Sequence, residues 1–196
     1  LTELRHHCGI LKVSATADRV RNYREVTDKP TIVFAHHRDV VDALVDELKD
    51  DFTVGLITGD VSAEKRQERV DAFQRGDIDV MICSTVAAKE GLTLTRADTV
   101  AFIEREWSPA WEEQAEDRVN RIGQDAETVH AVYLSVTGTI DEKFNAVVEE
   151  KRAVIQSILD GGDAVERKGI AKALLQSMVD AGDIPAEMLR DLGVKA

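Results

Sequence analysis

The segment PTIVFAHHRDVVDALVDEL, residues 30–48, carries the clearest structural pattern of the chain. Behind Pro30, residues 31–35 form a short continuous apolar run, which is typical of a strand buried on both faces. The next segment places five apolar side chains on one face of a helix over residues 38–48: Val40, Val41, Leu44, Val45 and Leu48. A buried strand followed at once by an amphipathic helix is half of a βαβ unit, so we expect a parallel sheet.

The same alternation continues along the chain. Its pattern predicts further strands at residues 54–57, 80–83, 99–103 and 129–134, with helices at 63–74, at 109–122 and from Thr139 onward. Thr139 and Glu142 have the spacing of a capping box. The order predicts an α/β fold, a parallel sheet with helices on both faces. Beyond Gly161–Gly162, residues 163–196 indicate a helical C-terminal tail of two short amphipathic helices.

Composition excludes several classes of protein. With 196 residues, 43% of them hydrophobic and 32% charged, the chain is globular, and its length fits roughly one domain with some extra chain. No apolar run approaches the roughly 20 residues of a membrane helix, so no membrane partner is expected. Cys8 and Cys83 lie far apart, form no metal or redox motif and indicate a reducing compartment. Because the chain begins at Leu1 rather than Met, we expect a fragment of a longer protein.

The net charge of −12 argues against a protein that surrounds nucleic acid, so any such contact must be local. In open α/β sheets the ligand site lies beyond the carboxyl ends of the strands. Those ends carry polar, small or aromatic residues: His36–His37, Thr58–Gly59–Asp60, Ser84–Thr85 and Glu104–Trp107. For any one of them, an ordinary loop residue is the alternative. The two histidines have no third ligand at metal spacing, so no metal site is expected.

The segment QAEDRVNRIGQ, residues 114–124, carries the strongest chemical signal. At about 100° per residue, Gln114, Arg118 and Arg121 fall in one stripe of a helix. Two guanidinium groups three residues apart can grip a multiply charged anion such as a triphosphate. The alternative is a solvated charged face, with Asp117 and Arg121 as an ion pair one helical turn apart. Spacing alone leaves both interpretations open.

Residues 114–124 resemble motif VI of the Swi/Snf-type family of superfamily-two helicase-like ATPases, Gln-Ala-x-x-Arg-x-x-Arg-Ile-Gly-Gln. Upstream, residues 84–95 resemble motif V, residues 107–109 the family's Trp-Asn-Pro, and residues 31–35 motif IV. The order of motifs agrees over residues 30–159, and Gln-Ala-Glu-Asp-Arg-Val is similar to the annealing-helicase branch. The chain departs from the family pattern at several positions: Val86, residues 88–90, Glu104 and Ser108.

The resemblance implies a C-terminal RecA-like lobe over residues 30–159, an N-terminal helical linker over residues 1–29 and a helical extension over residues 160–196. The sequence holds no Gly-x-x-x-x-Gly-Lys-Ser/Thr phosphate loop, and the family carries that motif on an N-terminal RecA-like lobe. ATP and Mg²⁺ would therefore be held mainly by that other lobe. Arg118 and Arg121 would be its arginine fingers. The nucleotide would also be bordered by Gln114, Glu90 and Gly91.

The resemblance also implies that the lobe holds DNA, which we expect to be double-stranded. The candidate contacts are Thr58, Gly59, Ser84, Thr85, Lys89 and Trp107. For Trp107, an aromatic at the edge of the core is an equal alternative. We expect a cytoplasmic protein of a bacterial or phage-infected cell, or a nuclear one if the source is eukaryotic. Two other functions stay open: a stand-alone α/β binding or regulatory module, and a small α/β hydrolase, which would lack a nucleophile elbow.

Overall fold

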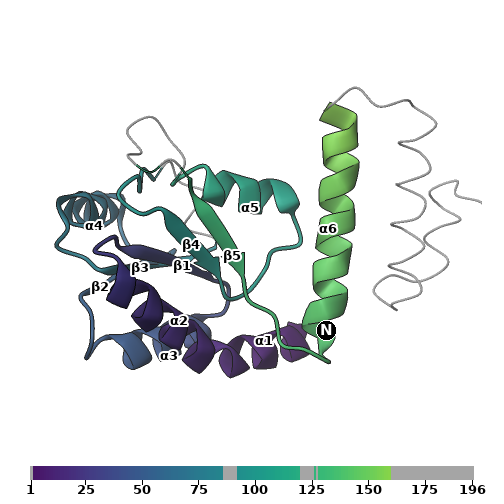
Figure 1. Cartoon of the computed structure of the whole chain (residues 1–196), viewed down its shortest axis with the longest axis horizontal. Coiled ribbons are helices and arrows are strands. Elements are labelled where there is room, and N and C mark those ends of the chain that lie inside the picture. The colour runs from purple at the N-terminus through teal and green to yellow at the C-terminus, as the bar shows by residue number, and fades with distance from the viewer. Residues whose placement is uncertain (1, 86–91, 120–125, 127, 160–196) are drawn as a thin grey trace, which may run out of the picture.

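The computed structural model describes residues 2–85, 92–119, 126 and 128–159. Its centre is a five-stranded sheet in the order β2-β3-β1-β4-β5, in which all neighbours run parallel (Figure 1). The strands are β1 (Thr31–Ala35), β2 (Val54–Ile57), β3 (Val80–Ser84), β4 (Thr99–Phe102) and β5 (His130–Tyr133). The predicted parallel α/β architecture is confirmed.

Helices cover both faces of this sheet because successive side chains of a strand point to opposite sides. Ile32 and Phe34 of β1 pack beneath α4 (Ala63–Arg75) and α5 (Pro109–Glu116). Val33 and Ala35 pack on the other side, against α2 (Val13–Val26) and α3 (Arg38–Leu48). All five residues of β1 are buried. The apolar residues of β1 therefore contribute to the hydrophobic cores on both faces of the sheet.

The two N-terminal helices belong to the packed body. Val13, Ala17 and Val20 of α2 are buried in the same core cluster as α3. The first helix, α1 (Thr2–Leu11), packs against α3 and against the long last helix, α6 (Ile140–Leu159), which stands beside the sheet (Figure 1). The segment predicted as a helical linker is thus helical over residues 2–11 and 13–26. The proposed domain boundaries stay predictions.

One predicted helix is wrong in its extent. The helix expected over residues 109–122 ends at Glu116, because the chain then tightens into a turn. The backbone N–H groups of Arg118 and Val119 each bond three residues back, to Ala115 at 3.2 Å and Glu116 at 3.0 Å. The side chain of Val119, four residues after Ala115, is fully buried in the core. The helix therefore gives way to a tighter turn while the apolar face of this segment stays buried.

No described helix is long and apolar enough to cross a membrane. The tail predicted over residues 163–196 lies outside the described residues.

Candidate functional site

The carboxyl ends of the strands meet at one edge of the sheet, as expected. Ser84 of β3 lies opposite Ala35 of β1, and Phe34 lies opposite Phe102 of β4. The next residue, Thr85, is 2% exposed, and its backbone N–H donates to the carbonyl oxygen of Ala35 at 2.9 Å. This edge brings together residues that lie some fifty positions apart along the chain.

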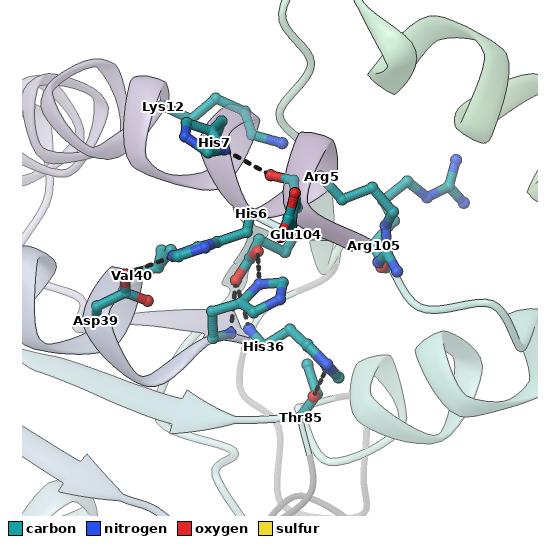
Figure 2. Close-up of polar contacts among 12 residues, drawn as sticks. Arg5, His6, His7, Lys12, His36, Asp39, Val40, Thr85, Glu104 and Arg105 are labelled. Carbon is teal, nitrogen blue, oxygen red and sulfur yellow. Dashed lines mark hydrogen bonds and ion pairs between the residues drawn. The ribbon is translucent and has the colours of Figure 1, made fainter. Parts of the chain in front are cut away.

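Glu104 organises the centre of this edge, which Figure 2 shows. Its carboxylate is 3% exposed and accepts hydrogen bonds from the backbone N–H of His36 at 2.7 Å and of His37 at 2.9 Å. The ring Nδ1 of His37 lies 2.5 Å from the same carboxylate. His37 immediately precedes helix α3, whose first backbone N–H groups have no partner within the helix. Glu104 therefore acts as a distant cap for α3, and His37 contributes to that cap.

Helix α1 lies against Glu104 because Gly9 has no side chain. A Cβ added at Gly9 would stand 2.7 Å from an oxygen of Glu104, and only glycine allows such an approach. Alongside, the ring of His6 stacks on His37 at 4.6 Å between ring centres. The carbonyl oxygen of Arg105 also accepts a hydrogen bond from Arg5 at 2.5 Å. Helix α1 is thereby fixed to the edge of the sheet where the carboxyl ends of the strands meet.

His36 connects two further residues of the edge. Its Nδ1 lies 2.7 Å from Glu106 and 3.1 Å from the hydroxyl of Thr85. The hydrogen bond to Glu106 raises the pKa of His36 above its ordinary value, against the opposing effect of burial. Burial alone would raise the pKa of Glu106, but hydrogen bonds with His36 and Thr85 bring that pKa below its usual range. His36 and Glu106 therefore form an ion pair whenever the His36 ring is protonated.

The predicted DNA-contacting residues differ in accessibility. Thr58 is 4% exposed, and the N–H and hydroxyl of Thr85 are both engaged inside the fold. Gly59 is exposed, with open space around its Cα. The buried guanidinium of Arg66 donates to the carbonyls of Thr58 and Gly59 at 3.4 and 3.3 Å. This contact shapes the loop after β2, in which Gly59 and Asp60 are exposed.

Trp107 lies at the junction with α6 rather than in open solvent. Its ring packs edge-on against Phe144, with 4.5 Å between ring centres, and the ammonium of Lys151 lies 4.7 Å from that ring. Lys151 also donates to the carbonyl oxygen of Trp107 at 3.2 Å. This environment favours the core-edge interpretation of Trp107, and its contact with DNA stays a prediction.

Of the candidate nucleotide residues, the structure describes Gln114 and Arg118. Helix α5 begins near the carboxyl end of β4 and runs back over the sheet (Figure 1). Just beyond the end of α5, the carbonyl oxygen of Arg118 accepts a hydrogen bond from the backbone N–H of Leu94, in the segment that precedes β4, at 3.0 Å. Gln114 is exposed on α5 and Arg118 is half-buried. The remaining predicted residues, Lys89, Glu90, Gly91 and Arg121, lie outside the described residues. No described group of three or more His, Cys, Asp or Glu side chains could hold a metal ion.

The sequence interpretation missed one buried ionic group. Glu112 of α5 is fully buried, and two arginines, Arg105 and Arg152, bond to its carboxylate. A signal was available, because Glu112 stands three residues before the buried Ala115 on the inner face of α5. A carboxylate at such a position requires cationic partners.

The model of the helicase conserved C-terminal domain matches residues 12–123, more than half of the chain. The chain belongs to this family. Similar proteins carry Swi/Snf names. A SWI/SNF-related regulator of chromatin, subfamily A-like protein 1, of Xenopus tropicalis is 37% identical over 146 residues, which is 74% of this chain and 15% of that protein. Human DNA annealing helicase and endonuclease ZRANB3 is 34% identical over 163 residues, 82% of this chain and 15% of its own length.

Solved structures of helicase domains share the fold. The C-terminal part of the Fun30 ATPase domain matches with a TM-score of 0.65 and 26% identity, over 69% of this chain and 44% of that one. The Hef helicase domain of Pyrococcus furiosus matches with a TM-score of 0.55 and 25% identity, over 69% of this chain and 28% of that one. The helicase C-terminal domain described here is therefore a Swi/Snf-type superfamily-two lobe with a RecA-like fold.

Proposed function

We propose that this helicase C-terminal domain is one motor lobe of an ATP-dependent DNA translocase. ATP and Mg²⁺ would be held mainly by an N-terminal RecA-like lobe, and Arg118 and Arg121 would reach the triphosphate from across the interface. The observation that carries the proposal is the complete motif at residues 114–124, which the family match overlaps up to residue 123. Relatives named as a helicase and a helicase/translocase support it.

The chemistry assigned to the arginines follows from phosphoryl transfer. Catalysis of that reaction is positioning plus neutralisation of charge, and an arginine supplied across an interface raises the rate by about 10³ to 10⁵. A guanidinium is always charged and donates in a planar fork that fits phosphate oxygens. Gln114, Glu90 and Gly91 would border the nucleotide on the same side.

The second role of the lobe is to hold DNA, proposed to be double-stranded. Gly59 offers an accessible backbone at the end of β2, next to half-buried Ser84 at the end of β3. Such backbone contacts need little net positive charge, which agrees with a chain of net charge −12. Thr58, Thr85, Lys89 and Trp107 complete the proposed set. In a cell the protein would accompany DNA, in the bacterial cytoplasm or the eukaryotic nucleus.

ATP hydrolysis by the purified chain tests the proposal. Because the phosphate loop is absent from this sequence, the chain alone should hydrolyse ATP at background rate with or without DNA, whereas the protein that carries both lobes should show DNA-stimulated hydrolysis. DNA-stimulated hydrolysis by the chain alone, abolished by Arg121→Ala, would refute the two-lobe account. Background rates from the two-lobe protein as well would favour the alternative, a binding or regulatory module without ATPase activity.

A further inference from the structure

Glu112 is a fully buried carboxylate in the middle of α5. Arg105, which follows β4, donates to both of its oxygens, from Nε at 3.0 Å and from Nη2 at 2.6 Å. Arg152 of α6 donates to one of the same oxygens at 3.0 Å. The backbone N–H of Glu106 adds a fourth bond at 3.3 Å. One side chain of α5 therefore holds both the end of β4 and helix α6.

Tyr133 of β5 completes this group. Its ring lies against both guanidinium groups, 4.2 Å from that of Arg105 and 5.6 Å from that of Arg152. Its hydroxyl donates to Glu116 and accepts from Arg152 at 3.1 Å. Burial, together with the bond to Glu116, raises the pKa of Tyr133, so the hydroxyl keeps its proton. We call these five residues the Glu112 cluster: Glu112, Arg105, Arg152, Tyr133 and Glu116.

The cluster fixes helix α5 along its length. Glu112 and Glu116 are one helical turn apart, and both are held by groups from other elements. Helix α5 has only eight residues, and Arg118 stands in the turn two residues after Glu116. A short helix has little stability of its own, so tertiary contacts decide where its end lies. The position of Arg118 is therefore constrained by the cluster, by the burial of Val119 and by the bond between Leu94 and Arg118.

We propose that Glu112 is a positioning residue for Arg118. It fixes the end of α5 relative to the sheet through its hydrogen bonds with Arg105 and Arg152. The inference builds on the proposed function, since it matters for turnover only if Arg118 acts on ATP. Enzyme rates fall steeply when a catalytic group is misplaced by about 1 Å. Loss of the cluster should therefore lower turnover more than it alters ATP affinity.

The test uses the protein that carries both lobes. Glu112→Gln keeps the shape of the side chain but removes the charge that two arginines share. We expect kcat to fall about tenfold while KM for ATP changes less than about twofold. Arg152→Gln removes one partner from a half-buried position and should lower kcat about threefold. The kcat of Arg152→Gln tests the proposal even if Glu112→Gln fails to fold.

A matched control is available on α6, the helix that carries Arg152. Asp141 of α6 forms an ion pair with Lys12 at 2.7 Å, and both side chains are at most 10% exposed. This pair anchors α6 to the N-terminal helices and makes no contact with Glu112 among the interactions described. Asp141→Asn should lower the melting temperature yet leave kcat within about twofold of wild type. An equal fall in kcat for Asp141→Asn would overturn the assignment to Glu112.

A double-mutant cycle separates positioning from general destabilisation. In an Arg118→Ala background, Glu112→Gln should lower kcat no further, because the residue through which it acts is gone. A further tenfold fall in the double variant contradicts the inference, as does normal turnover of Glu112→Gln with only a lower melting temperature. Normal turnover of Arg118→Ala itself would instead overturn the proposed function, so the two failures are distinguishable.

Discussion

The backbone N–H of Leu94 donates to the carbonyl oxygen of Arg118, with 3.0 Å between the two atoms. Leu94 is fully buried and belongs to the segment predicted to be motif V, which follows the end of β3 that we propose faces DNA. Arg118 belongs to the turn predicted to act on ATP. A direct bond between these segments means that a shift of one strains the other. We expect DNA binding and ATP turnover to be coupled through this contact.

DNA binding by the chain alone should be weak and sensitive to salt. An acidic body with a small accessible backbone patch contacts few phosphates, and each contacted phosphate contributes about −0.9 to the slope of log affinity against log salt concentration. Titration of labelled duplex DNA with the purified chain at two or more salt concentrations measures that slope. Nanomolar, sequence-specific binding that is insensitive to salt would contradict the prediction.

Gly76→Ala should destabilise the fold by about 1–2 kcal/mol. Gly76 ends helix α4 with φ +91°, and an added Cβ would stand 2.6 Å from the guanidinium of Arg96. Alanine is disfavoured at this position by the left-handed backbone conformation and by the close approach of the Arg96 side chain. Gly59→Ala is the matched control, because nothing lies within 4 Å of its added Cβ and its φ is not positive. Urea denaturation of both variants measures the difference; equal stabilities would contradict the prediction.

The stability that His36 contributes should depend on pH. Its folded pKa is raised by Glu106, so its contribution is fully present below about pH 6.5, the ordinary histidine value, and is lost as pH rises through the folded pKa. His36→Gln should therefore destabilise the chain more at pH 5.5 than at pH 8.5. The effect is modest, because the His36 side chain is 37% exposed. Thermal melts of the wild type and the variant at the two pH values test this. A larger loss of stability at pH 8.5 than at pH 5.5 would contradict the prediction.

Both cysteine thiols should resist modification in the folded chain. Burial raises the pKa of Cys83 to about 12, and Cys8 is 5% exposed. Because the thiolate is the reactive form, labelling by a thiol reagent requires opening of the structure. We expect labelling of Cys83 to become fast only in denaturant. Rapid labelling of Cys83 at neutral pH without denaturant would contradict its burial in the sheet.

Much of the fold could be predicted from the sequence because apolar periodicity records burial. The helix over residues 38–48 and the strand over residues 31–35 have the predicted bounds, since each carries an unbroken apolar pattern. The end of α5 could not be predicted in the same way. There the carbonyl oxygen of Arg118 accepts a bond from Leu94, a contact between distant segments that no local pattern encodes.

The polar organisation of the site was less predictable. His36 and His37 drew attention as a pair at a strand end, but their partners, Glu104 and Glu106, lie some seventy residues away in sequence. The spacing of Glu112 from Ala115 indicates the inner face of α5 but not its partners. Only the packing of α6 against α5 shows that it is buried beside Arg105 and Arg152. Such ionic contacts follow from tertiary geometry.

The most direct test of the central claim is turnover by Arg118→Ala in the protein that carries both lobes, with kcat, ATP affinity and melting temperature measured on the same preparation. We predict a fall in kcat of about a hundredfold or more, a much smaller change in ATP affinity, and incomplete rescue by Arg118→Lys, which lacks the planar fork. Arg121→Ala should behave alike. Near-normal turnover with only a small shift in melting temperature would show that Arg118 is an ordinary surface charge and would contradict the account.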